Sequence, residues 1–485
     1  MPRALLCRLA ILLLVCLPVR LFAQSPEDRA TLEALRDSLT AVSDSVALRR
    51  LEAATIEVAK QDRDNPLIHL RLGFIAYRLG EIGDAKSHFD DAAGEFEWAA
   101  ELRPDWPYAW YGLGLAELAA GEHSSIAIEN LRQVLGKDYL SKAAHSFARA
   151  VQADPAFAQA TIDLASTALA QRMQPRLGVA LEAVRLAVAS AAGGYPEVQL
   201  ARGRVEREVG EVDSALAGFR AYLEAGGDPG VGSLELARTL YFARRPAEGW
   251  RTYLAGARAA ASPEALALYR ADFSWVAAPA ELAEFDSLGS PEARAAWLER
   301  FWSRRDVMEA RTEGERLAEH YRRWFYAKRH FRLVSRHRLY DITERYRSAQ
   351  SEFDDRGIIY LRHGEPDQRA RFTSLGVEPN ESWLYRRAEG NLIFHFVARD
   401  DVSDYKLVES LSDVLGFRAA VRAQGGRDST VAALYATRDQ LDPIFRRVGD
   451  GASSVGPALA EERRQGRKSL EVGTTSDSYR QQFEE

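Results

Sequence analysis

The side chains best suited to chemistry in this sequence lie between residues 355 and 367. Asp355, His363 and Asp367 supply two carboxyl groups and an imidazole, and Arg356 and Glu365 lie among them. If the fold brought these groups together, they could act as general acid and base or bind a hard metal ion. An envelope hydrolase or a metal-dependent enzyme centred on this segment is therefore one hypothesis.

A structural role for the same segment is the other hypothesis, and we favour it. Arg356 would pair with a carboxylate, residues 364–366 would form a turn, and His363 would bond to the backbone. His395 would be a packed core imidazole, because it alternates with apolar residues along a strand-like run. The nine histidines include no H-x-x-x-H or H-x-H pair, and the chain has no nucleophile elbow, P-loop or dinucleotide-binding motif. We predict a non-enzymatic protein with no resident metal and no cofactor.

A basic stretch at 316–347 offers a different kind of chemistry. It contains ten Arg and Lys residues and three acids, interleaved with aromatic side chains. Such a composition suits nucleic acid, an anionic membrane surface, or pairing with acids of the same chain. The net charge of −6 argues against a dedicated nucleic-acid binder. We predict no nucleic-acid partner, favour pairing within the protein, and keep contact with a membrane surface as the alternative.

The first 24 residues have the features of a secretory signal peptide. Arg3 and Arg8 accompany an apolar stretch at 9–17, and Phe22-Ala-Gln24 is a plausible cleavage region. The apolar stretch is shorter than the roughly 20 residues that span a bilayer; an uncleaved anchor is the alternative. Both cysteines lie in this segment, so the mature chain would have no disulfide or thiolate. We predict an exported protein, periplasmic or secreted, cleaved near Ala23.

Residues 66–260 repeat a helical pattern. The run Trp110-Tyr-Gly-Leu-Gly114 has the spacing W-x-x-L-G, and the pattern A-x-x-x-F begins at Ala85, Ala143 and Ala215. Prolines at 104, 155 and 229 close successive units. Jointly these positions resemble the tetratricopeptide repeat; a plain helical bundle is the alternative. Small glycines would let paired helices approach, and the phenylalanines would fill the gaps between them.

The resemblance implies stacked helix pairs whose concave face binds a protein or peptide. It places the groove-facing residues on the first helix of each pair, and here they would be Phe74, Tyr77, Tyr108, Tyr111, Leu115, Arg204 and Arg207. The two arginines could grip a carboxylate of the partner. The alternative for them is a solvated helix face.

The second half of the chain changes from a helical to a strand-like period. Ser262-Pro-Glu and Ser290-Pro-Glu each have the cap, proline and acid that begin a helix. Strands are then predicted at 357–361, 383–385, 392–397 and 404–408, with a hairpin turn at 389–391. Helices followed by a run of strands indicate an α+β domain with an antiparallel sheet.

Four runs in this half carry a second family resemblance. They are Phe301-Trp-Ser-Arg-Arg-Asp306, Asp355-Arg-Gly-Ile-Ile-Tyr-Leu-Arg-His-Gly-Glu-Pro-Asp367, Trp383-Leu-Tyr385 and Phe394-x-Phe396. They resemble the GWxTD domain of exported bacterial proteins, which often follows tetratricopeptide repeats. Where the name-giving motif is expected, the sequence is Ser351-Glu-Phe-Asp-Asp355, and only the final Asp is retained. The resemblance implies an architecture rather than a reaction, because the family has no established one.

We therefore predict a mainly α fold, a tetratricopeptide-like helical solenoid followed by an α+β domain with a small antiparallel sheet. The predicted segments are a signal peptide at 1–24, N-terminal helices at 25–65, repeats at 66–260, a helical linker at 261–289, a GWxTD-like domain at 290–412, C-terminal helices at 413–447 and a disordered tail at 448–485. The predicted function is an exported scaffold or adaptor that holds a protein or peptide in the repeat groove. The ligand of the GWxTD-like domain and the oligomeric state are left open.

Overall fold

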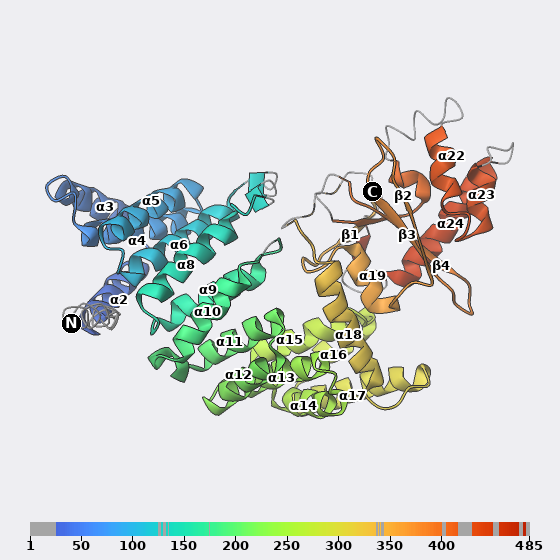
Figure 1. Cartoon of the computed structure of the whole chain (residues 1–485), viewed down its shortest axis with the longest axis horizontal. Helices are drawn as coiled ribbons and strands as arrows, with labels where there is room; N and C mark the ends of the chain where they lie inside the picture. The colour runs from blue at the N-terminus through green and yellow to red at the C-terminus, as the bar shows by residue number, and fades with distance from the viewer. Residues whose placement is uncertain are drawn as a thin grey trace, which may run out of the picture. The chain divides into compact units, whose positions relative to one another are not determined.

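The computed structural model describes residues 26–124, 128–129, 132–133, 135–173, 175–335, 338, 340, 344–399, 404–415, 429–449, 455–474 and 479–481. The predicted signal peptide lies outside these residues. Contacts divide the chain into two compact units (Figure 1). The first comprises residues 1–125, 136–171 and 175–205, and the second comprises 126–135, 172–174 and 206–485. The domain boundaries drawn from the sequence stay predictions.

The first unit is built from helices that pack in successive pairs. Two helices, α2 (Pro26–Thr40) and α3 (Ser45–Ala59), come first. The pairs are α4 (Pro66–Gly83) with α5 (Lys86–Leu102), α6 (Pro107–Glu122) with α8 (Tyr139–Ala153), and α9 (Ala158–Ala170) with α10 (Leu177–Val188). We call these six helices the repeat array. The 3-10 helix η1 (Ala191–Gly194) follows them, and α11 (Pro196–Val209) belongs to the first unit up to Val205 and to the second from Glu206.

Two glycines of the repeat pattern account for the close approach of paired helices. A Cβ on Gly73 would lie 2.7 Å from the ring of Phe96, and a Cβ on Gly114 would lie 2.5 Å from the ring of Phe147. Both rings are fully buried in the core of the repeat array. The predicted role of small glycines beside large phenylalanines is therefore confirmed.

The second unit begins with further helices. They are α12 (Val212–Glu224), α13 (Pro229–Phe242), α14 (Pro246–Ala259), α15 (Pro263–Ser274), α16 (Pro279–Asp286), α17 (Pro291–Met308) and α18 (Glu315–His330). Two helix starts predicted from the sequence are confirmed: the hydroxyls of Ser262 and Ser290 accept from the backbone N–H groups of Ala265 and Ala293. Each serine thereby satisfies a donor that the first turn leaves unpaired.

The rest of the second unit contains a four-stranded antiparallel sheet. Its order is β2 (Gln368–Phe372), β3 (Asn380–Tyr385), β4 (Leu392–Val397) and β5 (Lys406–Val408). Every residue of β3 and β4 is buried, because helices cover both faces. One face packs on α20 (Leu411–Val414), α22 (Ser429–Ala436) and α23 (Pro443–Gly449). A separate two-stranded ribbon pairs β1 (Tyr346–Ser348) with β6 (Tyr479–Gln481).

The strand predicted at 357–361 is wrong, because this run lies in the helix α19 (Asp355–His363). Asp354 caps that helix by accepting from the N–H groups of Arg356 and Gly357, and Gly364, at a φ of +80°, ends it. All residues from Ile358 to Leu361 are buried, so the run shows no polar face. A short apolar run of this kind has no period that separates helix from strand.

The disordered tail predicted from residue 448 is also wrong over 455–473, where the chain forms α24 (Val455–Gly473). Few large apolar residues mark this helix, and polar contacts hold it instead. Glu462, buried, accepts from the N–H of Leu411 at 2.7 Å and from the hydroxyl of Tyr435 at 2.8 Å. Composition counts such a glutamate as a solvated residue, which is why the sequence misses the helix. Within the C-terminal helices predicted at 413–447, residues 416–428 lie outside the described residues.

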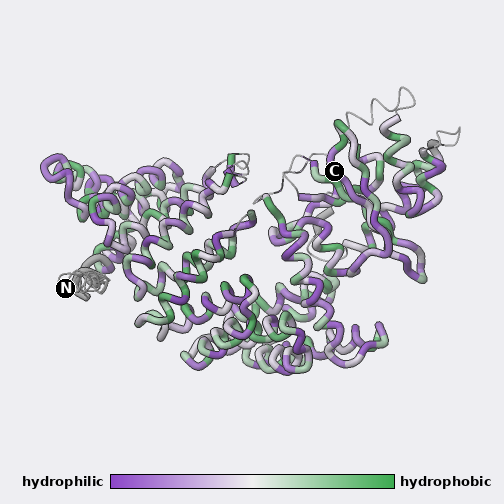
Figure 2. Tube along the Cα trace, in the orientation of Figure 1, coloured by the Kyte–Doolittle hydropathy of each residue, from purple (hydrophilic) through white to green (hydrophobic). Residues whose placement is uncertain are grey.

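The predicted fold class is confirmed: mainly α, with tetratricopeptide-like helix pairs and then an α+β region with a small antiparallel sheet. Within the described part of the chain, no helix is both long enough and apolar enough to cross a membrane. Polar positions interrupt the apolar ones along the helices (Figure 2).

Candidate functional site

A row of tyrosines crosses the first helices of the pairs in the repeat array. Tyr77 lies on α4, Tyr108 and Tyr111 lie on α6, and Asp163 lies on α9. The hydroxyl of Tyr111 donates to Asp163 Oδ2 at 2.9 Å, and that of Tyr108 donates to Glu33 Oε1 at 2.7 Å. We call Tyr77, Tyr108, Tyr111 and Asp163 the tyrosine face.

Burial raises the pKa of two hydroxyls of this face. Burial and the nearby carboxylates of Glu81 and Glu122 raise the pKa of Tyr77 to about 12. Burial and the charge of Asp163 raise the pKa of Tyr111 still further. Burial also raises the pKa of Asp163, while the bond from Tyr111 opposes that rise. At neutral pH the tyrosines are therefore fixed donors, suited to holding carboxylate oxygens.

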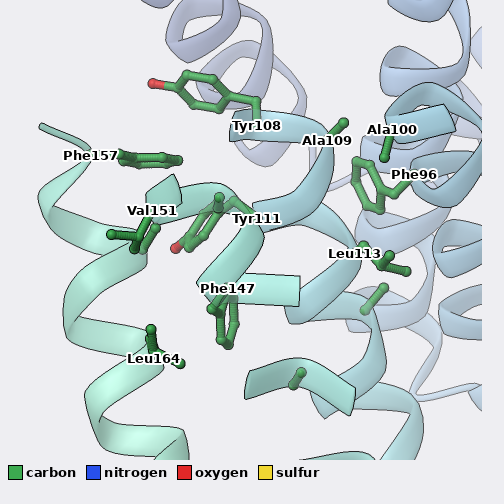
Figure 3. Close-up of a cluster of buried hydrophobic side chains, with 14 of the residues drawn as sticks. Phe96, Ala100, Tyr108, Ala109, Tyr111, Leu113, Phe147, Val151, Phe157 and Leu164 are labelled. Atoms are coloured by element: carbon green, nitrogen blue, oxygen red, sulfur yellow. The ribbon is translucent and has the colours of Figure 1, made fainter. Parts of the chain in front are cut away.

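The face is part of the core and not an open groove. Figure 3 shows Tyr111 between Phe157 and Phe147, and the ring centroids are 4.9 and 5.7 Å apart. Tyr108 is 1% exposed. Phe74 is buried edge-on against Phe96. The expectation that Phe74, Tyr108 and Tyr111 face an open groove is therefore wrong. Their large rings fill the space between helices, whereas Tyr77 and Leu115 are half-buried.

The two arginines predicted to bind a carboxylate of the partner differ in burial. Arg207 is buried, and its Nη1 donates to Glu235 Oε2 at 2.6 Å. Its guanidinium is therefore already paired within the protein, and the expectation that it binds a carboxylate of the partner is wrong. Arg204 is half-buried. The sequence does not reveal the acid that pairs with Arg207, because Glu235 lies 28 residues later and on another helix, α13.

The three residues of the enzyme hypothesis do not meet. Asp355 begins α19 and His363 ends it, about 12 Å apart along the axis at 1.5 Å per residue. Asp355 pairs with Arg338 and accepts from the N–H of Leu407 at 2.7 Å. Asp367 is exposed and accepts from the N–H of Arg386. Among the described residues, no group of three or more His, Cys, Asp or Glu side chains could hold a metal ion.

The structural hypothesis for this segment is confirmed in two respects. Arg356 pairs with Asp354 at 2.6 Å and stacks on Tyr405, with 3.6 Å from guanidinium to ring centre. His395 is buried and its Nδ1 lies 2.8 Å from the hydroxyl of Ser382. His363 differs from expectation: its ring lies near Tyr385 and Phe394, and within the described part of the chain its buried Nε2 has no hydrogen-bond partner.

A buried arginine beside His395 was not visible in the sequence. Arg438 is fully buried and donates to Ser382, Asn380 and Thr437. No carboxylate of the described residues forms an ion pair with it, and burial lowers its pKa to about 10. The neutral oxygens around it satisfy its donors, as a buried cation requires. The same environment lowers the pKa of His395 to about 3.

Described basic residues of the stretch at 316–347 pair within the protein, as predicted. Arg322 and Arg323 bind Glu319 at 2.6 and 2.7 Å, and Arg345 binds Glu409 at 3.2 Å. Arg316 is buried near Glu309, and Lys328 lies 3.3 Å from Glu208.

No protein-family model matches this chain, and no curated protein matches it. Solved structures of tetratricopeptide-repeat (TPR) proteins are similar to part of it. YrrB, described as a TPR protein with an unusual peptide-binding site, is 15% identical over 45% of this chain and 98% of its own, with a TM-score of 0.33. A thermophilic TPR protein of Thermus thermophilus is 22% identical over 43% and 98%, with a TM-score of 0.28. PilF of Pseudomonas aeruginosa is 17% identical over 50% and 94%, with a TM-score of 0.29. At these TM-scores the likenesses support no argument about function or partner.

Proposed function

We propose that this protein is an exported, non-enzymatic scaffold or adaptor that binds a protein or peptide through the repeat array. One observation carries the proposal: the repeat array stacks its helices in successive pairs, and Tyr77 of α4 and Leu115 of α6 stay half-buried on it. Tyrosine joins a large apolar surface to a polar tip, which is why it is enriched where proteins meet. Stacked helix pairs supply the extended surface that such binding needs.

Export and the second module are parts of the same proposal. The signal-like residues 1–24 support a periplasmic or secreted location, and the GWxTD-like runs support a second module whose ligand is unidentified. That module would engage another partner or, through 316–347, an anionic membrane surface.

The test is comparative capture from the native envelope. The tagged chain and its Tyr77→Ala/Tyr111→Phe variant are used as bait, and captured proteins are quantified by mass spectrometry. We expect the variant to lose the captured partner by about tenfold or more, which is about 1.4 kcal/mol of binding. The matched control is Tyr435→Phe, because Tyr435 also donates to a buried carboxylate, that of Glu462, and is not part of the repeat array. Equal capture by a folded double variant would overturn the proposal.

A further inference from the structure

The helix α2 lies against the tyrosine face. Its Glu33 accepts from the hydroxyl of Tyr108, and the Arg36 guanidinium lies close enough to Tyr111 to oppose the rise of its pKa. The carbonyl of Val42, just after α2, accepts from Arg78 Nε of α4 at 2.9 Å. The segment 33–42 therefore covers both α4 and α6 on the side where their tyrosines lie.

The apolar contacts that the structure describes for α2 lie in its second half and just after it. Leu39 is 4% exposed and belongs to the core cluster, while Leu35 and Val42 pack against that cluster half-buried. The other side of the helix is exposed, at Ala34, Asp37, Ser38 and Thr40. A helix of 15 residues is only marginally stable by itself in water. Among the side chains of α2 that the structure describes, Leu39 and the Glu33–Tyr108 bond form the buried attachment, together with Leu35 and the carbonyl of Val42.

The contacts of α2 are those of a bound peptide ligand. A carboxylate meets a tyrosine hydroxyl, and leucine side chains four residues apart meet an apolar surface, as when an amphipathic helix binds a groove. The segment 41–44 tethers α2 to α3. A short tether of this kind gives a linked ligand an effective concentration in the millimolar range, so α2 competes with any free ligand of the same face.

We propose that α2 is an exchangeable internal ligand of the tyrosine face, displaced when a partner's amphipathic helix with the same carboxylate and leucine spacing binds there. This inference rests on the protein-binding function proposed above and adds its regulation. The partner segment is of one chemistry: a helix whose acidic residue replaces Glu33 and whose leucine replaces Leu39.

The experiment measures binding of a fluorescent peptide of residues 26–42 to the purified full chain by anisotropy. In the released variant Glu33→Lys/Leu39→Ser, the contacts of α2 are removed, so the face is free for the added peptide. We expect this variant to bind the peptide at least about tenfold more tightly than the unaltered chain does, since its own α2 no longer competes for the face. The matched control is Asp37→Lys, which makes the same charge reversal at an exposed position of α2 and should bind like the unaltered chain.

Absence of binding by a folded released variant, or equal binding by all three chains, would overturn the inference. Hydrogen exchange of the unaltered chain is the second measurement. We expect amides of α2 to exchange before those of α4, whereas exchange of both only on global unfolding would make α2 an integral helix and also overturn the inference. If partner capture still depends on Tyr77 and Tyr111 while the peptide does not bind, the proposed function stands and this inference alone fails.

Discussion

Arg238 donates from two nitrogens to both carboxylate oxygens of Asp272, in the interior of the second unit. Tyr321 donates to the same carboxylate at 2.6 Å, and Arg238 also pairs with Glu235, the partner of Arg207. Four charged side chains from α11, α13 and α15 thus form one buried network of ion pairs. Each charge is stable there only while its partners remain.

Removing one member of this network should therefore lower the free energy of unfolding. We expect Asp272→Asn to lower the free energy of unfolding by about 3–5 kcal/mol, because Arg238 stays buried with less compensation. Urea denaturation measures the change. The control is Asp286→Asn, which breaks the exposed Arg270–Asp286 pair and should cost less than about 1 kcal/mol. Equal small losses in both variants would contradict a buried, interdependent network.

The packing of glycine against phenylalanine gives a second prediction. Gly114→Ala places a Cβ 2.5 Å from the Phe147 ring, so we expect a loss of about 1–3 kcal/mol from overpacking. Gly94 is the control, because it lies in α5 with nothing within 4 Å of its Cβ position. There Ala should stabilise the helix by about 0.5–1 kcal/mol. Thermal unfolding of both variants measures this difference, and a stabilised Gly114→Ala would contradict the close contact.

Acid should destabilise the sheet through His395. Burial, with help from Arg438, lowers the pKa of its imidazole to about 3, against about 6.5 in an unfolded chain. The stability due to the neutral imidazole is complete above about pH 6.5 and is lost as pH falls toward 3, by up to about 1.4 kcal/mol per pH unit. We expect His395→Gln to flatten the fall in unfolding free energy between pH 6.5 and 5, roughly the window where an unfolded imidazole becomes charged. His330→Gln, at an exposed position, should change that slope less.

Glu462 should act in the opposite direction. Burial raises the pKa of its carboxyl to about 7, so the neutral acid fits the fold better than the anion does. Its contribution is complete below about pH 4.5 and is lost as pH rises toward 7, at about 1.4 kcal/mol per pKa unit. We expect Glu462→Gln to be relatively more stable near about pH 8 than near about pH 5, compared with the unaltered chain. Unfolding in urea at the two pH values measures this, and an unchanged pH dependence would contradict the raised pKa.

Local signals in the sequence predicted much of the fold, and tertiary contacts decided the rest. Helix starts at Ser262 and Ser290 were predictable because a cap, a proline and an acid act within one turn. The strand at 392–397 was predictable because its apolar residues are flanked by a clear turn. In contrast, α19 is buried on all sides, and β2 alternates arginine with other residues at a sheet edge.

The sequence predicted which residues share the candidate site better than it predicted their burial and their hydrogen bonds. The repeat pattern led to Tyr77, Tyr108 and Tyr111, which do share one face. The hydroxyls of Tyr108 and Tyr111 bind Glu33 and Asp163, which lie 75 and 52 positions away, and one sequence does not specify such distant pairs. Asp355 and His363 look suited to chemistry because they are close in sequence, but a helix holds them at opposite ends.

Asp355 also determines how the sheet ends. Its carboxylate accepts from the N–H of Leu407, and its own N–H donates to the carbonyl of Tyr405. Both backbone groups lie on the outer side of β5, where a further strand would pair. One residue at a helix start thus occupies two backbone groups that a further strand would need for pairing. The acid that first suggests catalysis therefore has a structural role at the outer edge of β5.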